Sequence, residues 1–122
     1  MTFVTADSCR TQLERLTQLL VAAFPGSTVY QHTDLCRVPH DILNNKVDAV
    51  FLETEVEESN SLDFVRMLRR QKKSLPVFIF SQTEDLREEA AEAGVNDYFV
   101  QPVTEQQLRD AIQSVKDKEN AS

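Results

Sequence analysis

With 122 residues, of which 41% are hydrophobic and 27% charged, the chain has the size and composition of one globular domain. Its net charge of -7 argues against a nucleic-acid-binding domain, because gripping a phosphodiester backbone requires clustered lysine and arginine. No apolar stretch approaches the roughly 20 residues that span a bilayer, and Asp7 comes too early for a secretory leader, so we expect a cytoplasmic domain without membrane contact.

Five short apolar runs predict five β-strands in chain order: Thr2–Ala6, Thr28–Gln31, Asp48–Leu52, Pro76–Phe80 and Asp97–Val100. The last three hold continuous apolar stretches in place of the alternation that is typical of a half-exposed strand. Continuous apolar strands suit a parallel sheet that helices cover on both faces. The runs therefore predict a buried, parallel sheet.

The segments between these runs carry apolar residues at steps of three and four, the spacing of an amphipathic helix. Four such stripes occur: Leu13, Leu16, Leu20 and Ala23; Leu62, Val65, Met67 and Leu68; Leu86, Ala90 and Ala93; and Leu108, Ile112 and Val115. Ser81-x-x-Glu84 and Thr104-x-x-Gln107 match the capping box that begins a helix, and Gly94 is a typical helix terminator.

Strand and helix alternate five times, an order that predicts a three-layer, doubly wound α/β sandwich. Pro39 limits the helix between residues 34 and 45 to a short one. We expect one domain over residues 1–117 and a polar tail or the start of a linker at residues 118–122. Ligands of such sheets bind at the carboxyl ends of the strands. The candidate site residues are those that end strands: Asp7, Glu53, Ser81 and Gln101.

Other chemistry-bearing residues form weaker patterns. His32, Cys36 and His40 are spaced by four and include zinc-ligand types, but they are only three and Pro39 interrupts the helix that would align them. Cys9 and Cys36 show no CxxC spacing, which favours reduced thiols. A solvated face at a helix end is predicted for the basic cluster Arg66, Arg69, Arg70, Lys72 and Lys73. With two glycines, the chain has no phosphate-binding loop.

The segments "VDAVFLE", "SLDFVRMLRR" and "EAGVNDYFVQP", with a weaker match at "FVTADS", resemble the receiver domain of response regulators. Their order and spacing extend the resemblance over essentially the whole chain. It implies a flavodoxin-like fold whose five parallel strands have the order 2-1-3-4-5. It also implies a role in two-component, phosphorelay signal transduction.

In that family an aspartate ending the third strand accepts a phosphoryl group from a histidine kinase, and two acids after the first strand help to bind Mg²⁺. A serine or threonine and a lysine contact the phosphoryl oxygens. The resemblance assigns these positions as follows: Glu53 to the phosphoacceptor, Ala6 and Asp7 to the acid pair, Ser81 to the hydroxyl, Gln101 before Pro102 to the lysine, and Tyr98 to an aromatic switch residue.

Three of these positions depart from the family pattern. Glu53 is one methylene longer than aspartate, which misplaces its carboxylate for in-line attack. Ala6 removes an oxygen ligand, so Asp7, Glu53 and Glu55 offer Mg²⁺ a weak or lost site, and no cofactor is required. Gln101 cannot supply the cation that offsets phosphoryl charge. We therefore predict an atypical, phosphorylation-independent interaction module that is not an enzyme.

Three hypotheses remain open for the strand-end carboxylates. Glu53 is a partial phosphoryl mimic bonded to Ser81, or a relic; in either case repulsion from Asp7 should raise a carboxylate pKa. Alternatively, Glu53 is a working phosphoacceptor in a histidine-kinase phosphorelay, as in the receiver part of a transcription regulator. The third hypothesis is an enzyme that uses Asp7 and Glu53 as a metal-dependent carboxylate pair.

The resemblance also implies a protein partner, such as a histidine kinase or an output domain. The family's usual contact face is the fourth helix, fifth strand and fifth helix, which also serves homodimers. That face corresponds here to Arg87, Glu92, Tyr98, Val103 and Gln107. A solvated loop is the prediction for the acids that follow the third strand: Glu55, Glu57 and Glu58.

Overall fold

Five parallel strands form the central sheet of the computed structural model, which describes residues 1–71 and 73–121, the last three through their backbone alone. The strands are β1 (Thr2–Ala6), β2 (Thr28–His32), β3 (Ala49–Glu53), β6 (Val77–Ser81) and β7 (Asp97–Val100). Their order is β2-β1-β3-β6-β7. Counted among these five strands alone, this is the predicted order 2-1-3-4-5, which is confirmed.

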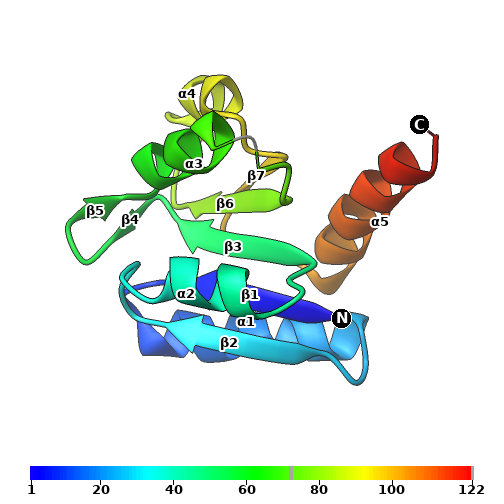
Figure 1. The fold of residues 1–122 in the computed structure, drawn as a ribbon. Coiled ribbons are helices and arrows are strands. Elements are labelled where there is room, and N and C mark those ends of the chain that lie inside the picture. Colours follow the sequence, from blue (N-terminus) through cyan, green and yellow to red (C-terminus); the bar gives the residue numbers. More distant parts are fainter. Residues whose placement is uncertain (72, 122) are drawn as a thin grey trace.

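Helices cover both faces of the sheet (Figure 1). One face carries α1 (Arg10–Ala23) and α5 (Glu105–Ala121), and the other carries α2 (Val38–Asn44), α3 (Ser61–Arg70) and α4 (Arg87–Ala93). The predicted three-layer sandwich is thus confirmed, and α5 continues through residues 118–121. None of the described helices combines the length and apolar character that crossing a bilayer requires.

The continuous apolar runs reflect burial on both sheet faces. In β3, Ala49 and Phe51 face α1 and α5, whereas Val50 and Leu52 pack beneath the opposite helices. The Phe51 ring stacks on Phe78 and Phe80 at centroid distances of 5.1 and 5.7 Å. Such aromatic contacts add to the free energy gained by burying apolar area. The strand therefore stays fully buried until its last residue.

Helix ends follow the local sequence signals with one exception. The Gln107 N–H donates to Thr104 Oγ1 at 3.2 Å and the Thr104 N–H donates to Gln107 Oε1 at 2.8 Å, so that capping box is confirmed. Gly94 ends α4 with a φ of 105°, as predicted. The box at Ser81 and Glu84 is wrong, because Ser81 still belongs to β6 and α4 begins only at Arg87.

A short hairpin follows β3, where the sequence predicted a loop. β4 (Glu55–Val56) pairs antiparallel with β5 (Ser59–Asn60). Both turn residues have positive φ, 46° at Glu57 and 65° at Glu58, as a type I′ turn requires. No glycine or asparagine marks this turn in the sequence, so the usual hairpin signal is missing. The three exposed glutamates therefore lie on an ordered projection.

Candidate functional site

The carboxyl edge of the sheet gathers the predicted site residues. The main-chain N–H groups of Asp7, Thr54 and Gln101 each donate to a carbonyl of the neighbouring strand, at 2.8–3.1 Å, and so continue the ladder past the strand ends. Because β1 and β3 are the neighbours at which the direction of winding reverses, Asp7 and Glu53 lie at the topological switch point. Together with Gln82 and the hairpin acids, both carboxylates line one open hollow.

Both carboxylate oxygens of Glu53 are hydrogen-bonded. Oε1 accepts from the Thr54 N–H at 3.0 Å and from the Thr54 hydroxyl at 2.8 Å. Oε2 accepts from Gln101 Nε2 at 3.3 Å, and Gln101 Oε1 in turn accepts from Gln82 Nε2 at 3.1 Å. The side chain that ends β3 is therefore linked across the sheet edge to the segments that follow β6 and β7.

Ser81 takes a different partner from the one that the sequence suggested. Its hydroxyl accepts from the Thr83 N–H at 3.2 Å, and no hydrogen bond within the described residues joins it to Glu53. The Ser81 side chain is buried, yet the Glu53 carboxylate turns toward Thr54 and Gln101. The hypothesis of a Glu53–Ser81 bond is therefore wrong for this conformation. Ser81 is also too far ahead of α4 to act as its N-cap.

The donor groups around Asp7 fit a Mg²⁺ ion poorly. Asp7 Oδ1 accepts from the Cys9 N–H at 2.9 Å, and both oxygens of Glu53 already have donors. Ala6 offers no side-chain oxygen, and Glu55 is exposed on the hairpin. A hard cation requires about six oxygen ligands. In the described part of the chain, no group of three His, Cys, Asp or Glu side chains could hold a metal ion.

Burial raises the pKa of both strand-end carboxyl groups above its ordinary value. For Asp7, desolvation outweighs the hydrogen bond from the Cys9 N–H, which lowers the pKa. For Glu53, desolvation is again the largest cause, the Thr54 hydrogen bonds oppose it, and the charge of Asp7 raises the pKa least. The predicted direction is confirmed, but loss of hydration is the main cause and repulsion a minor one.

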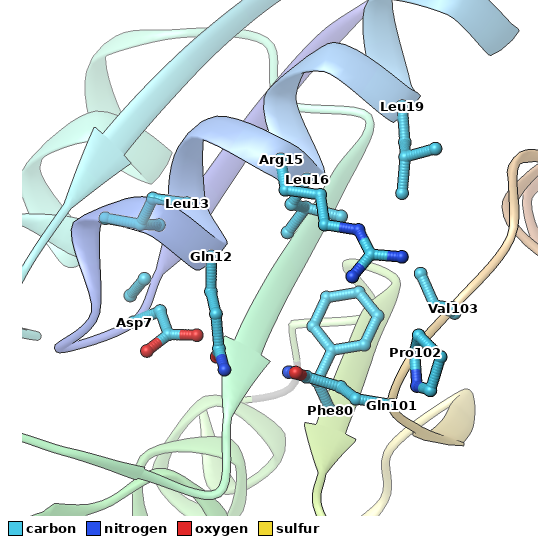
Figure 2. A pocket seen from close by; sticks show the side chains of 11 residues that line it. Asp7, Gln12, Leu13, Arg15, Leu16, Leu19, Phe80, Gln101, Pro102 and Val103 are labelled. Carbon is cyan, nitrogen blue, oxygen red and sulfur yellow. The ribbon is translucent and has the colours of Figure 1, made fainter.

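A cavity of about 80 Å³ adjoins this hollow, between α1 and the segment that follows β7 (Figure 2). It is lined by Ala6, Asp7, Gln12, Leu13, Arg15, Leu16, Leu19, Phe80, Gln101, Pro102 and Val103. The Gln101–Pro102 peptide bond is cis. Since Gln101 also donates to Glu53, its side chain connects the cavity to the carboxylate that ends β3.

The β4–β5 hairpin is attached to the same edge. The Glu57 N–H donates to the Ser8 hydroxyl at 2.8 Å, and the Ser61 hydroxyl donates to the Glu53 carbonyl oxygen. The Asn60 side chain accepts from the Leu62 N–H at 2.8 Å and caps α3. These bonds connect the acidic projection to the start of α1 and of α3.

The face formed by α4, β7 and α5 combines exposed and buried members of the predicted contact set. Arg87, Glu92 and Gln107 are exposed. Tyr98 is only 4% exposed, and its hydroxyl donates to the Thr83 carbonyl at 2.6 Å. The Arg87 guanidinium lies 5.0 Å from the Tyr98 ring centre and donates to the Tyr98 carbonyl. Val103, like Tyr98, is buried, so it could contribute to this face only from beneath the exposed residues.

Of the three residues in the weak zinc pattern, the two histidines have separate side-chain partners. His32 Nε2 is bonded to Asp41, and His40 Nδ1 lies 3.2 Å from Asn44 Nδ2. Cys36 and Cys9 are exposed free thiols. Within the basic cluster, Lys72 lies outside the described residues, and Arg69 differs from its predicted solvated role because it is bonded to backbone carbonyls.

Sequence reasoning missed several polar side chains of this site, among them Thr54, Gln82 and Arg15. Thr54 directly follows the strand-end acid, and a hydroxyl at such a position commonly bonds a neighbouring polar group, so this residue had a usable signal. Gln82 and Arg15 had no such sequence signal, because their positions relative to the site depend on the orientation of the β6–α4 loop and of α1.

Comparisons with known proteins agree with this geometry. The response regulator receiver domain family matches residues 4–113. A relative named "Chemotaxis protein CheY homolog", from Campylobacter jejuni, is 32% identical over 96 residues, covering 69% of this chain and 73% of the relative.

Two solved structures show the same fold. The response regulator receiver domain protein from Clostridium thermocellum has a TM-score of 0.85 at 22% identity, covering 98% of this chain and 97% of its own. A DNA-binding response regulator of the LuxR family from Staphylococcus aureus has a TM-score of 0.81 at 15% identity, covering 93% and 97%. At such identities the likeness concerns the fold alone.

Proposed function

The chain belongs to the response regulator receiver domain family, and we propose that it acts as a phosphorylation-independent interaction module of two-component signalling. The observation that carries this proposal is the hydrogen bond of 3.3 Å from Gln101 Nε2 to Glu53 Oε2. In the family, the residue at the position of Gln101 contacts a phosphoryl group on the strand-end acid. Here the glutamate carboxylate itself receives that contact.

Glu53 is a partial mimic of a phosphorylated aspartate. Its extra methylene carries the carboxylate toward Gln101, where an attached phosphoryl oxygen would otherwise accept. A carboxylate has one charge and fewer acceptor oxygens than a phosphate, and Ser81 remains bonded to Thr83. The proposed mimicry therefore concerns the phosphoryl contact with Gln101 and not the phosphoryl contact with the Ser81 hydroxyl.

The proposed output surface is the face of α4, β7 and α5. Gln101 follows β7 and is bonded to Gln82, which follows β6. Beyond Gln82, the Thr83 carbonyl accepts from the Tyr98 hydroxyl, so the β6–α4 loop connects the Glu53 network to the buried ring. Arg87 covers that ring from outside. We infer that a regulatory protein, such as a histidine kinase, an output domain or a second copy of this chain, contacts this surface.

The module requires no cofactor and carries out no reaction in this proposal. Receiver domains are regulatory, and the donor set around Asp7 and Glu53 supplies few free oxygens to a divalent ion. Any Mg²⁺ binding at Asp7, Glu53 and Glu55 should therefore be weak. The same shortage of free oxygens argues against a metal-dependent carboxylate enzyme.

A working phosphoacceptor is the second candidate function. Family membership and the retained Asp7 and Ser81 favour it. Two relatives carry regulatory names, one a chemotaxis protein and the other a DNA-binding response regulator, so a relay or a transcription regulator is the corresponding setting.

NMR spectra recorded with Mg²⁺ and beryllium trifluoride, a phosphoryl analogue, test the proposal. We expect the amide signals of Tyr98 and Gln101 to stay unchanged, because the carboxylate already occupies the contact to Gln101. Glu53→Ala should move both signals, since it removes that contact, while Glu55→Ala on the exposed hairpin should move neither. A saturable response of the native chain to the analogue would overturn the proposal and favour the phosphoacceptor.

A further inference from the structure

The cavity beside Gln101 has an apolar wall and a polar end. Its apolar side is formed by Leu16, Leu19, Phe80 and Val103. Figure 2 shows the Asp7 and Gln12 side chains at one end, and the Arg15 guanidinium near the Phe80 ring toward the other end. Such a combination of an apolar surface with a few convergent polar groups is typical of small-molecule sites.

Three polar groups that line the cavity have unused bonding capacity. Asp7 uses Oδ1 to accept from the Cys9 N–H, which leaves Oδ2 without a partner in the described chain. Among the described side chains, those of residues 1–71 and 73–118, and the described backbone, neither the Gln12 amide nor the Arg15 guanidinium has a hydrogen-bond or ion-pair partner. A buried carboxylate, from Asp7, and an exposed guanidinium, from Arg15, thus border one cavity with no ion pair between them.

We propose that this cavity binds a small aliphatic α-amino acid as its zwitterion. The ammonium group would donate to Asp7 Oδ2 and Gln12 Oε1, and the carboxylate would accept from Arg15. The aliphatic side chain would pack on Leu16 and Leu19. At about 30 Å³ for each water-sized group, a volume of about 80 Å³ takes about three heavy atoms. The cavity would therefore hold the isopropyl group of valine, while the ammonium and carboxylate groups would lie at its opening, toward the exposed Arg15.

Gln101 makes the site capable of regulating the rest of the domain. Its side chain borders the cavity and donates to Glu53, so an occupant would restrict the side chain that completes the mimic. This regulatory consequence rests on the function proposed above, whereas binding itself does not.

Titration of the ¹⁵N-labelled full chain with three matched compounds tests the site. Valine should give saturable shifts at Arg15, Gln101 and Val103 with a Kd of about 1 mM. Isobutylamine lacks the carboxylate and isovalerate lacks the ammonium, so each should bind about tenfold more weakly. Equal affinity for valine and either compound would overturn the zwitterion assignment, and a lack of saturable shifts with valine would overturn the site.

Variants on α1 separate this site from surface binding. Arg15→Gln should weaken valine about tenfold and leave isobutylamine unaffected, because only the carboxylate contact is lost. Arg10→Gln makes the same change on the same helix outside the cavity and should bind valine like the native chain. Unchanged valine affinity in Arg15→Gln would overturn the assignment. A phosphoryl adduct on Glu53 together with intact valine binding would overturn only the proposed function.

Discussion

The Glu53 carboxylate is partly buried, so it loses part of its hydration shell. Its carboxylate accepts three hydrogen bonds from Thr54 and Gln101, yet desolvation still raises its pKa. The folded state therefore binds the Glu53 proton more tightly than the unfolded chain does. The stability that this group contributes is present at low pH and is lost as the pH rises through the raised pKa.

Glu53→Gln should flatten the dependence of stability on pH. Glutamine keeps the shape of the side chain and removes the titration, so the fall in the free energy of unfolding between about pH 4 and pH 7 should become smaller. Urea unfolding of both proteins at the two pH values measures this difference. Glu55→Gln, at an exposed position, serves as the control. An identical fall in the native chain and Glu53→Gln would contradict the assigned burial.

Arg69 joins three segments through its guanidinium. Its Nε donates to the Gly94 carbonyl at 3.0 Å and its Nη1 donates to the Lys73 and Leu75 carbonyls at 2.8 Å. Burial lowers the pKa of Arg69, consistent with a cation held by carbonyl dipoles. Nothing in the spacing of the basic residues distinguishes this arginine from its exposed neighbour Arg70, so the sequence predicted the same solvated role for both.

Arg69→Ala should lower the free energy of unfolding by about 3 kcal/mol, because several charge-assisted hydrogen bonds to part-buried carbonyls are lost together. Arg69→Lys should recover little of this, since an ammonium cannot reproduce the fork of donors. Arg70→Ala, at the next and exposed position, should change stability by less than about 0.5 kcal/mol. Chemical denaturation gives all three values. Comparable losses in Arg69→Ala and Arg70→Ala would contradict the structural role.

At the scale of the elements, the turn of the β4–β5 hairpin is strained. Glu57 and Glu58 both adopt positive φ, a region that costs a residue with a Cβ roughly 1–2 kcal/mol. The helix and strand predictions succeeded where local sequence signals and burial agree, as at Thr104, at Gly94 and at the end of β3.

The loop prediction failed at this hairpin because its turn residues contradict the local backbone preference. Long-range contacts, such as the hydrogen bond from the Glu57 N–H to Ser8, hold the turn in place.

Replacing both turn residues, Glu57→Asn with Glu58→Gly, should raise the free energy of unfolding by about 1 kcal/mol. Asparagine and glycine adopt positive φ readily and form the preferred type I′ pair. Thermal unfolding of the double variant measures the gain. Glu55→Gln removes one acid without altering the turn, so it separates the conformational effect from the loss of charge repulsion. A gain of equal size in Glu55→Gln would assign the effect to charge alone.

At the scale of the whole molecule, the fold could be predicted because it depends on patterns that the chain repeats. Continuous apolar strands, amphipathic helices and their alternation leave few arrangements other than a doubly wound sheet. The sheet order then brings Asp7 and Glu53 to one edge, as expected. The directions of side chains at that edge could not be predicted. The turn of Glu53 toward Gln101, away from Ser81, depends on packing between segments that are distant in sequence.

In the function proposed above, the Glu53 carboxylate is a fixed occupant of the acceptor position of this receiver domain. Three substitutions distinguish it from the family pattern, at Ala6, Glu53 and Gln101. If these residues alone silence phosphotransfer, then the scaffold around them, including Asp7 and Ser81, should still support the reaction once all three are reversed.

Intact-mass spectrometry after incubation with Mg²⁺ and a small-molecule phosphodonor shows whether Glu53 accepts a phosphoryl group. The native chain should keep its mass, because the Glu53 carboxylate is misplaced for attack and bonded to Thr54 and Gln101. The triple variant Ala6→Asp, Glu53→Asp, Gln101→Lys should gain one phosphoryl group. The matched variant Ala6→Asp, Glu53→Asn, Gln101→Lys, which lacks an acceptor carboxylate, should gain none. A stoichiometric phosphoryl adduct on Glu53 of the native chain would instead show that this residue is a working phosphoacceptor.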